Sequence, residues 1–386
     1  MRILLAHSFY RIPGGEDRHV REQVELVSRA HDVRLVSEEN KELSESPITA
    51  ARMLYSRSKT RDIGATLDRF APDVVHVHNA YPSLGPAVLL AAHERRIPVV
   101  MSVHNFRLRC PNGFMFTAAK NCHRCETGMY VNAVLHKCFP TKRQALAYAT
   151  ALWVHRFAMR LERMIARFVV PSQFLRRRML EWGIDEGRIR VVRHFAASPR
   201  ATVPAEAGTY GAYVGRLSAE KGVDLLLRAL RRAGDPPFMI MGDGPRREQL
   251  ESLAGVLGLV NTRFLGARPH NEVEALLAHA RYVAIPSVGE EIFPLAAVEA
   301  LWAGRPLLVS DRGALPELAA AGAGFVCRPE DEVDTSQKLL QLIRDDELCR
   351  NVGAAALSTA RSLLAPERHL QDLEAVYREV AVERPM

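Results

Sequence analysis

Short apolar segments recur along the whole chain and alternate with longer amphipathic segments. The apolar segments are RILLAHS, DVRLVS, DVVHVHN, PVVMSVH, RFVVPS and IRVVRHF in the first half, and TYGAYVG, PFMIMGDG, TRFLG, RYVAIPS, RPLLVS and GAGFVC in the second. Apolar strands that alternate with helices are typical of parallel sheets covered by helices on both faces. The pattern therefore predicts an α/β protein built from doubly wound domains.

One segment without periodicity divides the chain. Residues 196–208, AASPRATVPAEAG, combine small residues with prolines, which is the composition of a linker. We expect a first domain over residues 1–195 and a second over residues 209–366. The last amphipathic segment predicts a helix over residues 367–386. With 386 residues the chain is long enough to bury two cores.

Charge is distributed unevenly along the sequence. The formal net charge is +8, and the excess of Lys and Arg lies in residues 1–195, whereas the remainder is acidic. A positive first half indicates an anionic partner, such as a nucleic acid, a membrane surface or a phosphorylated substrate. No apolar run is long enough to span a bilayer, and MRILLAHSF is too short for a secretion signal. We therefore expect a cytoplasmic protein.

Three turns that contain glycine follow predicted strands. Gly14 and Gly15 come before a predicted helix, where they allow a ligand to approach the backbone, although an ordinary turn has the same composition. The segment VGRLSAEKG places Arg216 and Lys221 in one loop, and two cations at the carboxyl end of a strand suit a diphosphate. The segment MGDGP closes the next strand at Gly242.

Two carboxylates lie around a predicted helix start in the segment IPSVGEEIFPLAAVEALWAGRP. Pro294 suits the first turn of a helix, and Gly304 ends the apolar run. Glu299, within the helix, and Glu291, just before it, can accept hydrogen bonds from sugar hydroxyls. A solvated loop acid and a chance helical glutamate are the alternative interpretation for this pair alone.

Read in order, the motifs of the chain resemble those of the family-four glycosyltransferases of the GT-B fold. The matching segments are GGE at 14–16, HVHN at 76–79, SVHN at 102–105, VPS at 170–172, GRLSAEKG, GDGP, FLG at 264–266, the two glutamates and SDRGALPEL at 310–318. The resemblance implies two Rossmann-like domains facing across a cleft. It also implies that the C-terminal helix crosses back to the first domain.

The resemblance further implies roles for individual residues. Arg216 and Lys221 bind the donor diphosphate, Glu299 holds the nucleotide ribose, and Glu291 contacts the donor sugar. The complete set of donor-binding residues that it implies is Gly14, Gly15, Arg216, Lys221, Gly242, Gly266, Glu291, Phe293, Leu295 and Glu299.

For catalysis the resemblance implies His104, Arg216, Lys221 and Glu291, with His104 at the reacting centre. Taken alone, His104 would be interpreted as a buried structural histidine. Members of the family retain the anomeric configuration and use no metal in the reaction. Two positions depart from the family pattern: Pro294 stands where glycine is usual, and His194 stands where asparagine is usual.

The expected function is accordingly that of a retaining glycosyltransferase. It would move a sugar from a nucleotide-diphosphate sugar to a glycan, a lipid-linked acceptor or a small molecule, in bacterial cell-surface polysaccharide or glycoconjugate synthesis. The alternatives are a catalytically silent GT-B homologue and a zinc-containing nucleic-acid-binding protein. The basic segments hold few aromatic residues, which argues against nucleic acid.

Cysteines cluster in a loop-rich insert over about residues 106–140. Cys110, Cys122, Cys125 and Cys138 supply the ligand number of a closed zinc site, and Cys122 and Cys125 have C-x2-C spacing. We expect a structural zinc ion there, with free thiols or a redox-labile pair as alternatives. No cofactor is expected in catalysis.

A basic amphipathic helix is predicted from about residue 143 to 168. Arg156, Arg160, Arg163 and Arg167 would share one face of it. Such a face can lie on an anionic membrane, where a lipid-linked acceptor would be found. A core helix with a solvated arginine face is the other interpretation.

Overall fold

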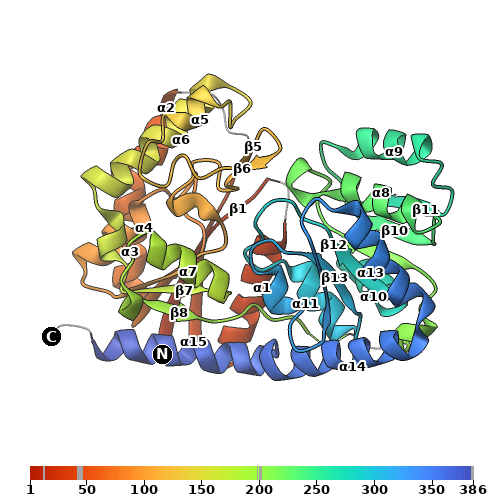
Figure 1. Cartoon of the computed structure of the whole chain (residues 1–386). Helices are drawn as coiled ribbons and strands as arrows, with labels where there is room; N and C mark the ends of the chain where they lie inside the picture. The colour runs from red at the N-terminus through yellow and green to blue at the C-terminus, as the bar shows by residue number, and fades with distance from the viewer. Residues whose placement is uncertain (12–13, 41–46, 198, 200–201, 384–386) are drawn as a thin grey trace. The chain divides into compact units, whose positions relative to one another are not determined.

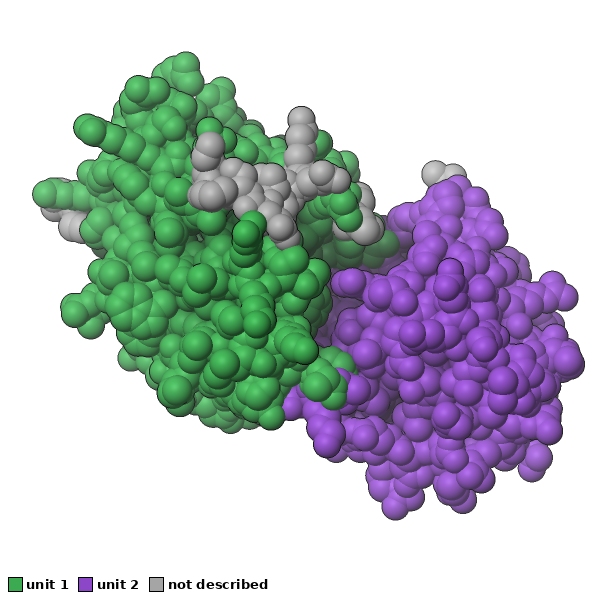
Figure 2. Space-filling model, turned by 90° about the horizontal axis from the view of Figure 1, so that it is seen from above, with its two compact units in different colours: residues 1–118, 122–192, 369–386 green, residues 119–121, 193–368 purple. Residues whose placement is uncertain are grey.

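The computed structural model describes residues 1–11, 14–40, 47–197, 199 and 202–383, and the chain forms two compact units (Figure 1). Unit 1 comprises residues 1–118, 122–192 and 369–386, and unit 2 comprises residues 119–121 and 193–368 (Figure 2). Each unit has its own parallel sheet, which confirms the predicted α/β class.

Unit 1 contains a six-stranded sheet with the order β2-β1-β3-β4-β7-β8, and all of its strand pairs are parallel. The strands are β1 (Arg2–Phe9), β2 (Asp32–Glu39), β3 (Val74–Val77), β4 (Val99–Ser102), β7 (Arg167–Val170) and β8 (Ile189–Val191). The helices are α1 (Gly15–Ser28), α2 (Pro47–Leu54), α3 (Arg57–Phe70), α4 (Ala87–Glu94), α5 (Asn132–Leu135), α6 (Lys142–Trp153), α7 (Gln173–Glu181) and most of α15 (Pro366–Val382). Strand β1 is buried from Ile3 to Phe9, as a central strand covered on both faces must be.

Unit 2 contains a second six-stranded parallel sheet with the order β11-β10-β9-β12-β13-β14. The strands are β9 (Gly211–Val214), β10 (Phe238–Met241), β11 (Thr262–Gly266), β12 (Tyr282–Ile285), β13 (Leu307–Ser310) and β14 (Gly324–Cys327). The helices are α8 (Val223–Arg232), α9 (Arg247–Val256), α10 (His270–Ala278), α11 (Leu295–Trp302), α12 (Leu315–Leu318), α13 (Glu332–Arg344) and α14 (Asp346–Leu363). Every strand of both sheets coincides with a predicted apolar segment.

The last helix, α15, is part of the core of unit 1. Leu373, Val376, Tyr377 and Val380 pack with Ile3, Leu5 and the apolar residues of neighbouring strands. The Tyr377 hydroxyl is also 2.7 Å from His76 Nδ1 on β3. The prediction that the C-terminal helix packs on the first domain is therefore confirmed.

The predicted helix over residues 143–168 is wrong in its second half. Helix α6 ends at Trp153 and is followed by a π-helical turn, Val154–Ala158. Arg160 then adopts a left-handed conformation, with φ 52°, and a 3-10 turn leads into β7. Because Arg167 lies on β7 and pairs with Glu379 at 2.9 Å, the four arginines do not form one helical face.

The insert between β4 and α6 contains little regular structure. A two-stranded ladder joins β5 (Phe116–Thr117) to β6 (Lys120–Asn121), and α5 has a single turn. Cys125 and Tyr130 form a small apolar cluster with Ala149 and Leu152 of α6, so the insert packs on that helix. Within the ranges described above, no helix is long and apolar enough to cross a membrane.

Leu373→Ala should destabilise unit 1, because the Leu373 side chain is fully buried against β1 and the strands beside it. Removing a buried leucine side chain costs about 2–5 kcal/mol. The free energy of unfolding measured in urea should fall by this amount. The matched control is Leu363→Ala, whose side chain is 39% exposed on α14. Equal losses in the two variants would show that α15 is not part of the core.

Candidate functional site

The strand order of unit 2 reverses between β9 and β12, so the loops after these two strands diverge at the carboxyl edge of the sheet. Ligands of open α/β sheets bind at such a reversal. The loop after β9 carries Arg216 and Lys221, and the loop after β12 carries Glu291. The topology thus brings the predicted donor residues of unit 2 to one edge.

The two loops contact each other through their backbones. The N–H groups of Val288 and Gly289 both donate to the Glu220 carbonyl at 2.9 Å. Gly222 has φ +63°, and a Cβ added there would lie 2.2 Å from the Pro286 carbonyl oxygen. Glycine is therefore required at the end of the GRLSAEKG segment, because any side chain would separate the loops.

Lys221 and Glu291 form an ion pair across these loops. Lys221 Nζ lies 2.7 Å from Glu291 Oε1, and both side chains are largely buried. The Ser287 hydroxyl donates to the same carboxylate oxygen at 2.6 Å. The Glu291 backbone carbonyl accepts from the N–H of Ala314 at 2.7 Å, which ties the segment to the loop after β13. The carboxylate is thus held by Lys221 and Ser287, and the backbone of Glu291 is held by the loop after β13.

Arg216 has no such partner. Its side chain is exposed, and within the part of the chain that the structure describes its guanidinium makes no hydrogen bond or ion pair. Its carbonyl oxygen accepts from the Tyr213 hydroxyl at 2.9 Å, and that interaction holds the backbone of the loop. Burial and the carboxylates of Glu291 and Glu220 raise the pKa of Tyr213, so the phenol remains a donor.

Gly242, directly after β10, and Gly266, the last residue of β11, belong to the same edge. The Gly242 N–H donates to the Gly266 carbonyl at 2.8 Å. Gly242 has φ +142°, and a Cβ there would lie 1.8 Å from the Gly215 carbonyl oxygen. These contacts keep the edge free of side chains, and a phosphate could therefore approach the backbone.

Helix α11 begins next to Glu291. Pro294 is its N-cap, and Leu295 is its first residue, as the sequence predicted. Glu299 lies one turn into the helix and is 11% exposed, with His270 Nδ1 3.7 Å from its Oε1 atom. The Phe293 ring is buried and stacks edge-to-face with the His194 ring at 5.5 Å. The residue that departs from the family pattern at position 194 therefore supports the Glu291 loop.

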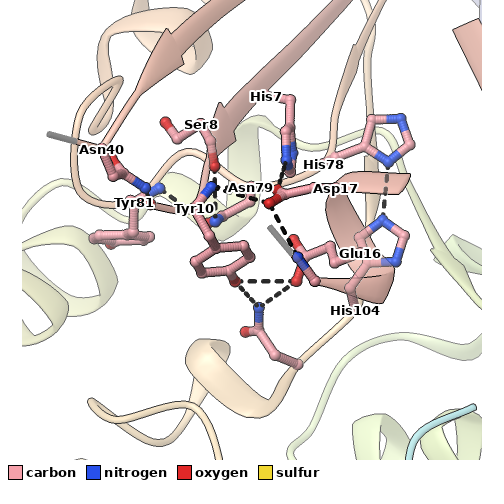
Figure 3. A network of polar contacts seen from close by, with 12 residues as sticks. His7, Ser8, Tyr10, Glu16, Asp17, Asn40, His78, Asn79, Tyr81 and His104 are labelled. Carbon is pink, nitrogen blue, oxygen red and sulfur yellow. Dashed lines mark hydrogen bonds and ion pairs between the residues drawn. The ribbon is translucent and has the colours of Figure 1, made fainter. Parts of the chain in front are cut away.

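The strand order of unit 1 also reverses, between β1 and β3. Gly14 is the N-cap of α1, which starts at Gly15, and Asp17 holds this turn to β1. Asp17 accepts from the N–H groups of Tyr10, at 3.2 Å, and Gly14, at 3.4 Å. Its other oxygen is 2.8 Å from His7 Nε2 (Figure 3). The buried carboxylate of Asp17 therefore holds the glycine turn against the end of β1.

Glu16 belongs to a second polar group at this turn. Its Oε2 atom accepts from the Tyr10 hydroxyl at 3.0 Å and from Asn105 Nδ2 at 3.4 Å (Figure 3). Burial raises the pKa of the Glu16 carboxyl above its ordinary value, and the neighbouring His7 and Tyr10 oppose this shift.

His104 lies in a cluster of buried histidines. His104 Nε2 is 2.9 Å from His78 Nδ1, and the two rings stack with a centroid separation of 5.2 Å (Figure 3). Gln23 Nε2 is 3.3 Å from His78 Nε2, and Gln23 Oε1 is 3.2 Å from His369 on α15. Burial, followed by repulsion from other histidines, lowers the pKa of His104 to about 3. His104 is therefore neutral at physiological pH and can accept or donate a hydrogen bond without a charge.

The structure thus brings the predicted residues together in two groups. Unit 2 contains Arg216, Lys221, Gly242, Gly266, Glu291, Phe293, Leu295 and Glu299. In unit 1, Gly14 and Gly15 follow β1, and His104 follows β4. Sequence reasoning missed the polar partners Asp17, Glu16, His78 and Asn105. Glu16, His78 and Asn105 lie within the quoted GGE, HVHN and SVHN motifs, which was the available signal.

The cysteines of the insert are neighbours but do not form a metal centre in this structure. Burial first, and then the nearby thiols of Cys110, Cys138 and Cys122, raise the pKa of Cys125 to about 12. All four carry free thiols. Among the residues whose placement is described, no group of three or more His, Cys, Asp or Glu side chains has an arrangement that could hold a metal ion.

Comparisons with known proteins match both halves of the chain. The family model "Glycosyltransferase Family 4" matches residues 13–196, and the model "Glycosyl transferases group 1" matches residues 197–359. Alpha-D-kanosaminyltransferase of Streptomyces kanamyceticus is 32% identical over 178 residues, which cover 44% of this chain and 45% of that protein. The first curated relatives are thus matched over less than half of their length.

Longer matches have lower identity. Glycogen synthase of Mycobacterium tuberculosis is 27% identical over 361 residues, which cover 90% of this chain and 80% of that enzyme. Among solved structures, HepE of Anabaena in complex with UDP and glucose superposes with a TM-score of 0.68 at 18% identity, covering 98% of this chain and 100% of that one. This likeness shows the fold.

Acidification should destabilise unit 1 through its buried histidines. Burial lowers the pKa of His76 to about 3, whereas the unfolded side chain has a pKa near 6.5. Between these values the unfolded state binds more protons, so the stabilisation is complete above pH 6.5 and is lost as the pH falls toward 3. At pH 5 the loss from His76 alone should be about 2 kcal/mol.

The measurement is the urea midpoint at pH 7.5 and pH 5.0. His76→Asn should reduce the pH-dependent difference, whereas His93→Asn, at an exposed position of α4, should leave it as in the wild type. A midpoint that does not change between the two pH values would contradict the neutral state of the cluster.

Proposed function

Since the chain belongs to the group 1 (family 4) glycosyltransferases of the GT-B fold, we propose that it transfers a sugar from a nucleotide-diphosphate sugar to an acceptor, with retention of configuration. The observation that supports this most directly is the Lys221–Glu291 ion pair, at 2.7 Å, at the strand-order reversal of unit 2. It joins a cation suited to phosphate and a carboxylate suited to sugar hydroxyls at one ligand-binding edge.

Donor binding would exchange partners within this pair. A diphosphate carries more negative charge than one carboxylate. Lys221 would therefore bind the diphosphate, together with the exposed guanidinium of Arg216. Glu291, still held by the Ser287 hydroxyl, would then be free to accept hydrogen bonds from the donor sugar. Negative charge that develops on the leaving diphosphate would be stabilised by the two cations, an effect that can be worth a few kcal/mol per donor.

Glu299 would hold the nucleotide. It lies in the second turn of α11, and the backbone N–H groups at the start of that helix offer a site for negative charge. His270 Nδ1 lies 3.7 Å from Glu299 Oε1, close to the proposed ribose position. Pro294 removes one N–H group at this position, so the donor contacts would rest on Phe293 and Leu295.

Unit 1 would supply the acceptor side of the reaction, with neutral His104 at the reacting end. We propose a glycan, a lipid-linked acceptor or a small molecule, used on the cytoplasmic side in surface polysaccharide or glycoconjugate synthesis. The excess of Lys and Arg in residues 1–195 supports an anionic partner. Because the predicted arginine face does not exist, peripheral contact with an anionic membrane would depend on this general charge alone.

The donor site predicts the response to nucleotides. A nucleoside diphosphate at millimolar concentration should raise the melting temperature, because a ligand bound to the folded state stabilises it by mass action. Glu299→Ala should weaken nucleotide binding, and Glu291→Ala should chiefly reduce donor hydrolysis. A lost charge-assisted hydrogen bond of about 1.5–3 kcal/mol corresponds to at least about tenfold in either quantity.

Glu248→Ala, at an exposed position of α9, is the matched control and should behave as the wild type. A panel of nucleoside diphosphates that leaves the melting temperature unchanged would refute the proposed function. Wild-type behaviour of both glutamate variants would remove this pair from the site.

We also propose that the insert binds a structural zinc ion through Cys110, Cys122, Cys125 and Cys138. The donor type and number suit zinc. The Cys110 thiol donates to Asn112 Oδ1 at 2.9 Å, which fixes its position in the insert. The present arrangement of the thiols does not fit a metal, so binding would have to draw the sulfurs together.

Purified protein should therefore contain about one zinc ion per chain by elemental analysis. The metal should be lost in the double variant Cys122→Ser/Cys125→Ser and kept in Cys327→Ser, a buried cysteine of unit 2. Folded protein without metal would refute the zinc site.

A further inference from the structure

A cavity of about 80 Å³ lies within unit 1, beside the histidine cluster. Its lining includes His78, Asn79, Tyr81, His104, Asn105 and Arg107. A space of this size holds a few water molecules, which corresponds to one substituent rather than a whole nucleotide. The cavity therefore suits a single functional group of a larger ligand.

Arg107 is the unmatched charge of this cavity. Its Nε atom is buried without a hydrogen-bond partner, and within the described ranges no carboxylate pairs with its guanidinium. Its neighbours are the rings of Tyr148 and Tyr81, with centroids 5.8 and 6.0 Å from its Cζ atom. Cation–π contacts at these distances do not replace a hydrogen-bond acceptor for the buried Nε–H group of this half-buried side chain.

The other charged groups of the lining, Arg156 and Glu162, differ in this respect. Arg156 donates to the Glu126 carbonyl and to the Tyr130 hydroxyl, both at 2.9 Å. Glu162, also in the lining, is paired with both terminal nitrogens of Arg109. These two charged groups are therefore satisfied by the protein itself.

The carboxylate of Glu16 does not pair with Arg107 either. Glu16 lies close enough to influence Arg107 electrostatically, but it accepts from Tyr10 and Asn105, and its Oε1 atom is buried without a partner. A buried polar atom without a partner, such as Arg107 Nε, is costly and needs an explanation in a native structure. An anion that enters the cavity would supply the missing acceptors.

We infer that this cavity recognises an anionic substituent of the acceptor, a phosphate or a carboxylate, through the Arg107 guanidinium. The planar fork of guanidinium matches both groups with two parallel hydrogen bonds. Because His104 lines the same cavity, the anion would orient the acceptor beside the proposed reacting centre; this part rests on the proposed function. Arg107 is thus a specificity-determining residue for the acceptor.

The test measures anion binding by the full chain. Melting temperatures are recorded in sodium phosphate and in sodium acetate, against sodium chloride at equal ionic strength, for wild type, Arg107→Gln, Arg107→Lys and Arg61→Gln. Arg61 is 78% exposed on α3, so its substitution is a control for the loss of one charge. Lys221→Gln is included because phosphate can also bind at the donor loop.

Phosphate or acetate should raise the melting temperature of wild type, Arg61→Gln and Lys221→Gln. The apparent dissociation constant should increase at least about tenfold in Arg107→Gln, because hydrogen bonds to a charged group are lost. Arg107→Lys, which keeps the charge without the fork, should be intermediate, and it preserves the test if the glutamine variant does not fold. A larger response to phosphate would indicate a phosphorylated acceptor, and a larger response to acetate a carboxylated one.

Equal responses of Arg107→Gln and Arg61→Gln would overturn the inference, as would a response lost only in Lys221→Gln or a response to neither anion. Nucleoside diphosphates should stabilise Arg107→Gln as they do the wild type. Failure of the proposed function would therefore be seen as a missing nucleotide response, independently of the anion result.

Discussion

Direct backbone contact between loops is the constraint on which the donor side of this protein depends. At the carboxyl edge of the unit 2 sheet, Gly222 meets the Pro286 carbonyl and Gly242 meets the Gly215 carbonyl without room for a side chain. Because the loops touch in this way, Lys221 and Glu291 are brought within ion-pair distance although they are separated by 70 positions in the chain. Backbone packing therefore sets the positions of the charged groups, and these groups then determine which ligands the edge can bind.

Unit 1 differs from unit 2 in that its carboxyl edge contains many buried polar side chains. Its corresponding edge is lined by polar side chains that are buried, and most of them are kept neutral by burial or satisfied by one another. Histidines that cannot take up a proton at physiological pH provide hydrogen bonds without the cost of a buried charge. Arg107 is the exception, because guanidinium does not lose its proton. It is therefore the charged group at this edge that an anionic ligand would bind.

The strands of both sheets could be predicted from the sequence because a parallel strand covered on both faces is a short apolar run with clear ends. The donor residues could be placed together because they follow such strands, and motif order supplied their roles. The helix after α6 could not be predicted, because its end depends on a left-handed Arg160 and on the pairing of Arg167 with α15. Neither signal is local. The same holds for Glu16, Asn105 and Arg107, whose importance lies in which partners they have and which they lack.

The position of α15 has a consequence for how the protein is made. Gln23 and His369 are 346 positions apart, and His76 and Tyr377 are 301 positions apart, yet both pairs are hydrogen-bonded inside unit 1. During synthesis, most of unit 1 emerges from the ribosome before unit 2, but it lacks one of its core helices until α15 has been translated. Unit 2 holds all of its strands before that point. The unit that is synthesised first is therefore the one that completes its core last, and until then its apolar surface must be kept from aggregating.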